Sequence, residues 1–225
     1  MSSSSSEFAR QRANMVAQIR TNDVTDIGLQ AAMLEIPREL FVPIAHQPMA
    51  YSDRSIEVAR GRFLLDPRAF AKLVQLADIQ PTDKVLDVGC ATGYSTAVLA
   101  SLAAQVTGLE QDADLVQTAG KALGALGIAN AAVTEGRLAG GLSGEAPFNV
   151  IFVNGAVTDR PDTLLSQLAD GGRLVCLYVK GNAGGLKLTE ARLYVRTGDA
   201  TGFRSAFDAD APVLPGFEKT AGFVF

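Results

Sequence analysis

Residues 85–94 read VLDVGCATGY, an apolar strand that runs into a glycine-containing turn and then into a helix. Gly89 and Gly93 allow the backbone to turn tightly and to approach a ligand closely. Open α/β sheets bind ligands at the carboxyl ends of their strands, which is where this turn lies. Glu110 ends the next expected strand, about 20 residues later, where an acidic residue can accept hydrogen bonds from ribose hydroxyls.

The chain around this turn alternates short apolar strands with helices, a pattern typical of a parallel, doubly wound α/β sheet. After Val179 the helices stop, and two further strands are expected to form an antiparallel edge. The predicted strands are 84–88, 105–109, 132–134, 150–153, 173–179, 186–196 and 219–225, and the predicted helices between them are 94–103, 112–126 and 161–169.

The N-terminal part has a different, mainly helical pattern. Apolar residues at helical spacing predict helices over 8–19 and 25–36, and Asp66-Pro67 is a typical start for a third helix. Residues 42–66 contain several Pro and Gly and are expected to form irregular structure. We therefore expect a disordered serine-rich stretch over 1–6, a helical and substrate-loop region over 7–80, and a cofactor-binding α/β domain over 81–225.

Composition narrows the possible functions. The chain has 20 Lys and Arg against 24 Asp and Glu, a net charge of −4, and a pI of about 5.1, whereas general nucleic-acid binders are usually basic. Its apolar stretches are shorter than the roughly 20 residues of a membrane helix, and no signal peptide is recognisable. Cys90 and Cys176 suggest neither a disulfide framework nor a metal site. A cytoplasmic protein that binds neither nucleic acid nor membranes is expected; the oligomeric state is not predictable.

The turn differs from a dinucleotide-binding fingerprint. Ala91 takes the place of the middle glycine, the third glycine is absent, and Asp87 would repel a pyrophosphate. S-adenosylmethionine carries a sulfonium and an ammonium and no phosphate, so an acidic site suits it. The stretch resembles motif I of the class I methyltransferases, which implies a Rossmann-like, mostly parallel seven-stranded sheet with helices on both faces. The predicted cofactor-binding residues are Asp87, Gly89, Cys90, Ala91, Thr92, Gly93, Tyr94, Glu110, Gln111, Glu135, Gly136 and Asn154.

Several further blocks resemble the protein-L-isoaspartate O-methyltransferase family, in the same order and spacing. They are I-P-R-E-L-F-V-P at 36–43, A-Y-S-D at 50–53, A-P-F-N-V-I-F-V at 146–153 and Q-L-A-D-G-G-R-L-V at 167–175. The resemblance covers roughly residues 8–180, and it is only loose over the C-terminal 40 residues. It implies methylation of isoaspartyl carboxylates in damaged proteins or peptides, with S-adenosylmethionine as the methyl donor.

One loop departs from that family's pattern. The family has G-Q-T-I-S-Q-P before the helix that precedes motif I, and its hydroxyls help to hold the substrate carboxylate. The corresponding stretch here is G-R-F-L-L-D-P at 61–67, so that Phe63 and Leu65 replace both hydroxyl residues. A guanidinium can bind a carboxylate through two hydrogen bonds, so Arg62 is a candidate replacement. Asp66 and Tyr51 are the other catalytic candidates.

Three interpretations follow from this loop. The chain is an isoaspartyl methyltransferase, or a methyltransferase with another, more apolar acceptor, or a cofactor-binding protein without enzyme activity. The position of Arg62, and whether Phe63 and Leu65 close or line a pocket, should distinguish them. Arg60, Arg62 and Arg68 can equally form a solvated cationic face, and Phe63 and Leu65 can equally be packing residues.

Overall fold

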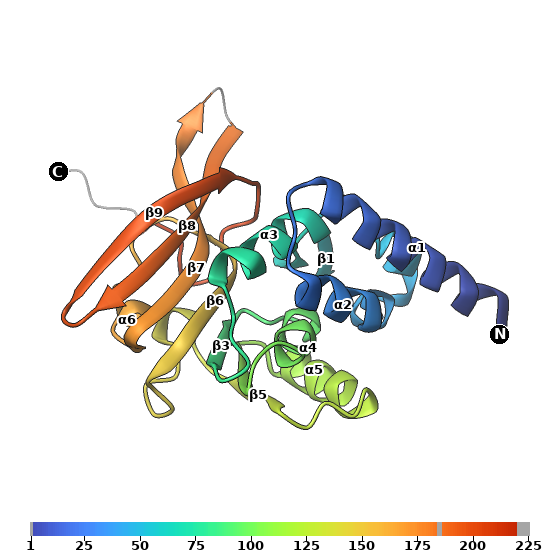
Figure 1. Ribbon diagram of the computed structural model, residues 1–225, viewed down its shortest axis with the longest axis horizontal. Coiled ribbons are helices and arrows are strands. Elements are labelled where there is room, and N and C mark those ends of the chain that lie inside the picture. Colours follow the sequence, from blue (N-terminus) through green and yellow to red (C-terminus); the bar gives the residue numbers. More distant parts are fainter. Residues whose placement is uncertain (1, 184–185, 220–225) are drawn as a thin grey trace.

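A seven-stranded sheet organises the chain in the computed structural model, which describes residues 2–183 and 186–219 (Figure 1). The strand order is β5-β4-β3-β6-β7-β8-β9; the first five are parallel, and β8 and β9 are antiparallel at one edge. The predicted α/β class with an antiparallel edge is confirmed. The strands are β3 (Lys84–Val88), β4 (Gln105–Glu110), β5 (Ala131–Glu135), β6 (Phe148–Val157), β7 (Leu168–Ala183), β8 (Leu186–Thr197) and β9 (Ala200–Asp208).

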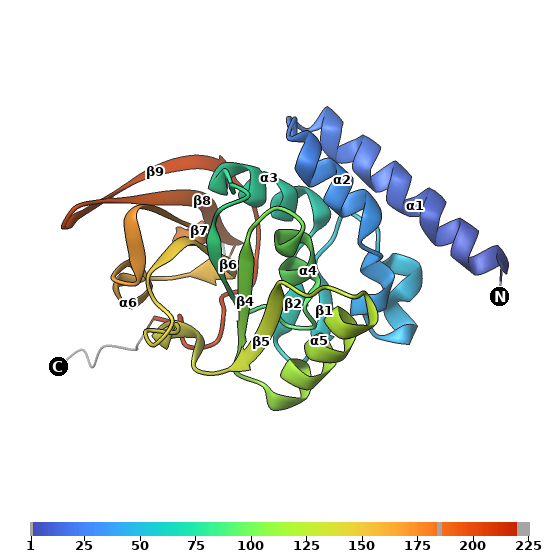
Figure 2. The same ribbon diagram turned by 60° about the horizontal axis from the view of Figure 1, so that its bottom comes forward.

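Helical segments cover both faces of this sheet. Successive residues of a strand point to opposite faces, so Val85 joins the apolar cluster beneath α1 to α5, whereas Leu86 joins the cluster beneath η3 and α6. Figures 1 and 2 show α1 at one end of the molecule and the β8–β9 edge at the other. The α-helices are α1 (Ser2–Thr21), α2 (Ile27–Glu35), α3 (Pro67–Ala77), α4 (Tyr94–Ala100), α5 (Ala113–Ala125) and α6 (Asp162–Leu165), and the 3-10 helices are η1 (Arg38–Phe41), η2 (Ile44–Met49) and η3 (Leu138–Gly140).

Aspartate side chains cap the helices α2, α3 and α5. The Asp66 carboxylate accepts a hydrogen bond from the Ala69 backbone N–H at 2.9 Å, and Pro67 occupies the first helical turn. Asp112 caps α5 in the same way, so the helix itself starts one residue later than predicted. The helix predicted over 161–169 is shorter, because the chain has already entered β7 at Leu168.

Two expectations from the sequence were wrong, and a third lies almost entirely outside the described residues. Residues 2–6 are not disordered, because they extend α1, whose buried Met15, Val16 and Ile19 anchor it; serine is acceptable in a helix. Ala200–Asp208 forms a strand that the sequence did not predict. The strand expected over 219–225 lies, apart from residue 219, outside the described part of the chain. The irregular stretch 42–66 contains a hairpin of β1 (Ile56–Ala59) and β2 (Arg62–Leu64) in addition to η2.

Buried polar contacts fix the N-terminal region against the turn after β3. The Arg38 guanidinium donates to the Ala50 carbonyl at 2.8 Å and to the Leu65 carbonyl at 2.6 Å, and it lies 4.7 Å from the centre of the Tyr94 ring. The Thr92 hydroxyl donates to the Phe41 carbonyl at 2.6 Å. Leu65 directly follows β2, so these contacts hold β2 close to the carboxyl ends of the parallel strands.

Candidate functional site: two buried carboxylates at the carboxyl edge of the sheet

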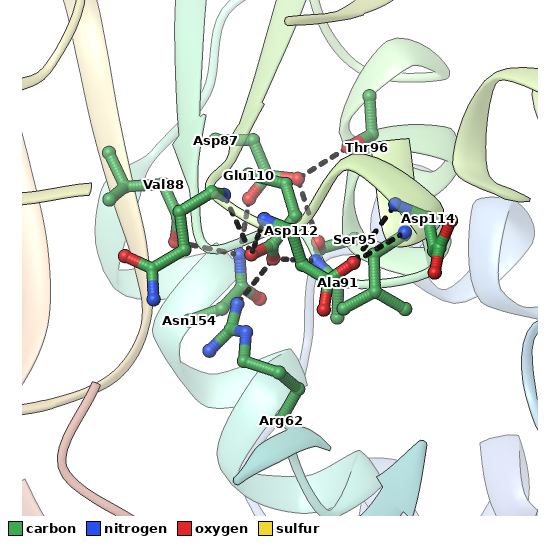
Figure 3. A network of polar contacts seen from close by, with 12 residues as sticks. Arg62, Asp87, Val88, Ala91, Ser95, Thr96, Glu110, Asp112, Asp114 and Asn154 are labelled. Atoms are coloured by element: carbon green, nitrogen blue, oxygen red, sulfur yellow. Dashed lines mark hydrogen bonds and ion pairs between the residues drawn. The ribbon is translucent and has the colours of Figure 1, made fainter. Parts of the chain in front are cut away.

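Asp87 lies near the end of β3 and is fully buried (Figure 3). Its carboxylate accepts hydrogen bonds from the Ser95 and Thr96 hydroxyls, each at 2.7 Å, and from the Asn154 amide nitrogen. Burial raises the pKa of Asp87 from 3.8 to about 6, and the three donors oppose that rise by stabilising the charged form. Asp87 therefore ties the start of α4 and the middle of β6 to the end of β3.

Glu110 ends β4 and is also fully buried, and every acceptor position of its carboxylate is used. One oxygen accepts from the Gln111 N–H at 2.8 Å and the Asp112 N–H at 3.4 Å. The other accepts from the Ala91 N–H at 2.9 Å and from the Arg62 guanidinium at 2.5 Å. Because a carboxylate offers about four lone-pair positions, a new donor has to replace one of these.

The glycine turn between β3 and α4 has the expected strained backbone. Gly89 and Gly93 have φ of +76° and +93°, and Ala91 has φ of +50°. A Cβ atom at position 93 would lie 3.0 Å from Ala119 Cβ, so that glycine allows α5 to approach. Cys90 is buried, and burial raises the pKa of its thiol well above the ordinary value, which argues against a reactive thiolate.

The predicted cofactor residues separate into a group at the sheet edge and a group turned away from it. Glu110 and Glu135 are register partners at the ends of β4 and β5, and the Gly136 N–H donates to the Glu110 carbonyl at 2.9 Å. Thr92 and Tyr94 instead face the N-terminal region, where the Tyr94 ring contacts Phe41 and Phe70. The edge group is Asp87, Gly89, Cys90, Ala91, Gly93, Glu110, Gln111, Glu135, Gly136 and Asn154.

The catalytic candidates have different surroundings. Arg62 is buried, with 4% of its surface exposed, and makes an ion pair with Glu110. The Tyr51 hydroxyl donates to the buried Glu39 carboxylate, and burial together with that contact raises the Tyr51 pKa. Asp66 is the cap of α3. Tyr51 and Asp66 thus have structural partners, whereas Arg62 belongs to the site.

A cavity of about 700 Å³ lies on the other side of β2. Phe63 lines it, whereas Leu65 is buried in the apolar core. Its other walls come from the end of α1, residues 53–55, the start of α3 and residues 210–212. These walls carry positively and negatively charged side chains, including Arg54, Arg68 and Asp210. The cavity is therefore neither closed by the two replaced loop residues nor an apolar pocket.

Leu214, which lies over the glycine turn, was not among the predicted site residues. A Cβ atom at Gly89 would meet Leu214 at 3.1 Å, and one at Gly155 would meet it at 2.6 Å. The segment that carries it, residues 211–217, is held to the end of β6 by hydrogen bonds in both directions between Ala156 and residues 212 and 214. Its pattern of two prolines and scattered apolar residues resembles an ordinary loop.

Metal or membrane features are not found in the part of the chain that the structure describes. Over residues 2–183 and 186–219, no group of three or more His, Cys, Asp and Glu side chains could hold a metal ion. None of the helices in those ranges combines the length and the apolar character of a membrane span.

Comparisons with known proteins agree with the fold and with the motif. The model of the protein-L-isoaspartate(D-aspartate) O-methyltransferase family matches residues 10–191. A protein-L-isoaspartate O-methyltransferase of Koribacter versatilis is 43% identical over 169 residues, 75% of this chain and 76% of that protein. Protein-L-isoaspartate O-methyltransferase 1 of Rhodopseudomonas palustris is 37% identical over 176 residues, 78% of this chain and 72% of that protein.

Solved structures share the architecture. One protein-L-isoaspartate O-methyltransferase superposes with a TM-score of 0.77 at 23% identity, over 91% of this chain and 66% of that chain. A Plasmodium falciparum protein described as the same enzyme, solved in complex with S-adenosyl-L-homocysteine, has a TM-score of 0.72 at 19% identity, over 90% of this chain and 97% of that chain. The family match over residues 10–191 and the relatives at 43% and 37% identity show that the chain belongs to the protein-L-isoaspartate O-methyltransferase family of S-adenosylmethionine-dependent methyltransferases.

Proposed function

We propose that this chain transfers a methyl group from S-adenosylmethionine to the carboxylate of isoaspartyl residues in proteins and peptides. The observation that carries the proposal is the Glu110 carboxylate, held by three backbone N–H groups at the carboxyl end of β4 beside the glycine turn, in a chain whose relatives have this activity. The relatives favour this acceptor over a different one and over a binding role without catalysis.

The residues at the sheet edge suit S-adenosylmethionine chemically. Glu110 would accept hydrogen bonds from the ribose hydroxyls, and Gly89, which has no side chain, would let the methionine part approach the backbone of the turn. Glu135 and Gly136, at the end of the neighbouring strand, would lie on the adenine side. Asp87 would act through Asn154 and the start of α4, which it holds in place. When bound, the cofactor supplies an electrophilic methyl group on a sulfonium.

The acceptor needs little chemical activation. A carboxylate with a pKa of about 4 is already ionised at neutral pH and requires no general base. The protein's contribution is alignment, which is worth roughly 7–11 kcal/mol when the reacting groups are well oriented. We place the acceptor in the cavity lined by Phe63, where Arg54 and Arg68 provide cations whose side chains make no ion pair or hydrogen bond among the described residues. A protein acceptor suits a chain of net charge −4 better than a nucleic acid does.

The proposal is tested by measuring methyl transfer from labelled S-adenosylmethionine to an isoaspartyl peptide, with the matched aspartyl peptide as control. S-adenosylhomocysteine affinity is measured by calorimetry on the same sample. We expect transfer to the isoaspartyl peptide alone. Glu110→Gln should weaken S-adenosylhomocysteine binding at least tenfold, because it loses the charged acceptor. Cofactor binding without transfer to either peptide would refute the isoaspartyl acceptor, and unchanged affinity in Glu110→Gln would refute the assigned cofactor site.

A further inference from the structure

Arg62 occupies the position at Glu110 that the cofactor's ribose needs. Three of the four acceptor positions of the carboxylate are used by backbone N–H groups, which cannot move without unfolding the turn. The fourth is used by Arg62. Ribose hydroxyls can therefore hydrogen-bond to Glu110 only after the guanidinium has left.

The Arg62 side chain is poorly satisfied where it lies. Its Nε atom is buried without a hydrogen-bond partner, and its contact with Glu110 uses one of five N–H donors. The other fully buried arginine, Arg38, differs: it bonds two backbone carbonyls and lies over an aromatic ring. A buried guanidinium with unused donors gives up little hydrogen bonding when it moves.

The space above the glycine turn is filled from two sides. A Cβ atom at Gly89 would lie 3.1 Å from the Arg62 guanidinium and 3.1 Å from a Leu214 methyl. Leu214 is 3% exposed and lies against both Gly89 and Gly155. The part of the cofactor that must approach the turn therefore meets both side chains.

Both closing elements lie outside the central seven-stranded sheet. Arg62 lies on the three-residue strand β2, which pairs only with β1 in a two-stranded sheet, and such hairpins are marginally stable on their own. Next to it, Gly61 has φ of +70° and open space around it. Leu214 lies in a segment outside the named strands, which is hydrogen-bonded to Ala156 in β6 and to Thr158 directly after it.

We propose that Arg62 and Leu214 close the cofactor site of the free enzyme, and that Arg62 competes directly with the cofactor's ribose for Glu110. The inference rests on the proposed function, since it takes S-adenosylmethionine as the ligand. Binding then requires the guanidinium to leave Glu110 and the segment 211–217 to move away from Gly89. Arg62 thereby determines the cofactor affinity without contacting the reacting atoms.

The test compares the affinity for S-adenosylhomocysteine, measured by calorimetry, in the unaltered protein and five variants. Arg62→Gln should tighten binding at least tenfold, because glutamine keeps the polarity but not the charge that holds Glu110. Arg60→Gln, an exposed arginine on the same hairpin, is the matched control and should leave the affinity unchanged. In a Glu110→Gln background the gain from Arg62→Gln should disappear.

Leu214→Ala gives an independent measurement if Arg62→Gln fails to fold, as judged by circular dichroism. It should tighten binding at least threefold, because the methyl groups above Gly89 are removed. Equal or weaker affinity in a folded Arg62→Gln, with measurable binding to the unaltered protein, would overturn this inference and leave the proposed function intact. Absence of binding in all folded variants would overturn both.

Discussion

The burial of Asp87 predicts a pH dependence of stability that one substitution should remove. Its pKa is raised from 3.8 to about 6 in the folded protein, so the folded state binds a proton more tightly than the unfolded state does. The resulting stabilisation is fully present below the unfolded pKa and is lost as the pH rises through the folded pKa. At about 1.36 kcal/mol for each pH unit between the two values, the total is about 3 kcal/mol.

Asp87→Asn keeps the size of the side chain and removes the titration. The free energy of unfolding, from urea denaturation at pH 4, 5, 6 and 7, is measured for the unaltered protein and for Asp87→Asn. The stability of the variant relative to the unaltered protein should rise by about 2.5 kcal/mol from pH 4 to pH 7, with most of the change below pH 6. Asp199→Asn, which removes an exposed carboxylate, controls for the general effect of charge. The reasoning would be refuted if the free energies of unfolding of Asp87→Asn and the unaltered protein differed by the same amount at every pH from 4 to 7.

Three further substitutions test the turn, the loop and the N-terminal contacts. Gly89→Ala should lower the free energy of unfolding by at least about 1 kcal/mol in urea denaturation, because φ is +76° and the new Cβ meets Arg62 and Leu214. The control Gly120→Ala, in a helix with open space, should be neutral or stabilising. An equal loss of stability in both variants would contradict this reasoning. Phe63→Thr should raise kcat/KM for an isoaspartyl peptide by restoring a hydroxyl at the cavity wall, and no gain in a folded variant would show that the cavity aligns the acceptor otherwise. Arg38→Met should lower the thermal midpoint by more than 4 °C, since two buried carbonyls lose their donor at ~1–3 kcal/mol each, and an unchanged midpoint would contradict that role.

The sequence predicted the local features of the site and not the contacts between distant residues. The glycine turn and Glu110 could be placed because each follows a short apolar strand, and parallel strands bring their carboxyl ends to one edge. Arg62 was recognised as unusual, but its pairing with Glu110, 48 residues away, is set by how the β1–β2 hairpin packs. Periodicity carries no information about such contacts.

The remaining errors have similar physical causes. Residues 200–208 were not predicted as a strand because β9 is an edge strand with almost no buried face, so its apolar residues show no alternation. The serines at 2–6 were assigned as disordered from composition alone. They extend a helix whose later residues, Met15, Val16 and Ile19, pack against the core. Leu214 was missed because two glycines far from it in sequence provide its packing site.

The alternation of side chains along β2 has a consequence for how this protein can change. Arg62 faces Glu110, and the next residue, Phe63, faces the cavity on the opposite side. Gain or loss of a single residue in the hairpin before them would exchange these orientations, putting an aromatic ring against a buried carboxylate and a cation into the cavity. We expect natural relatives of this chain to vary the exposed residues of the hairpin while keeping its length, or to change the length only in steps of two.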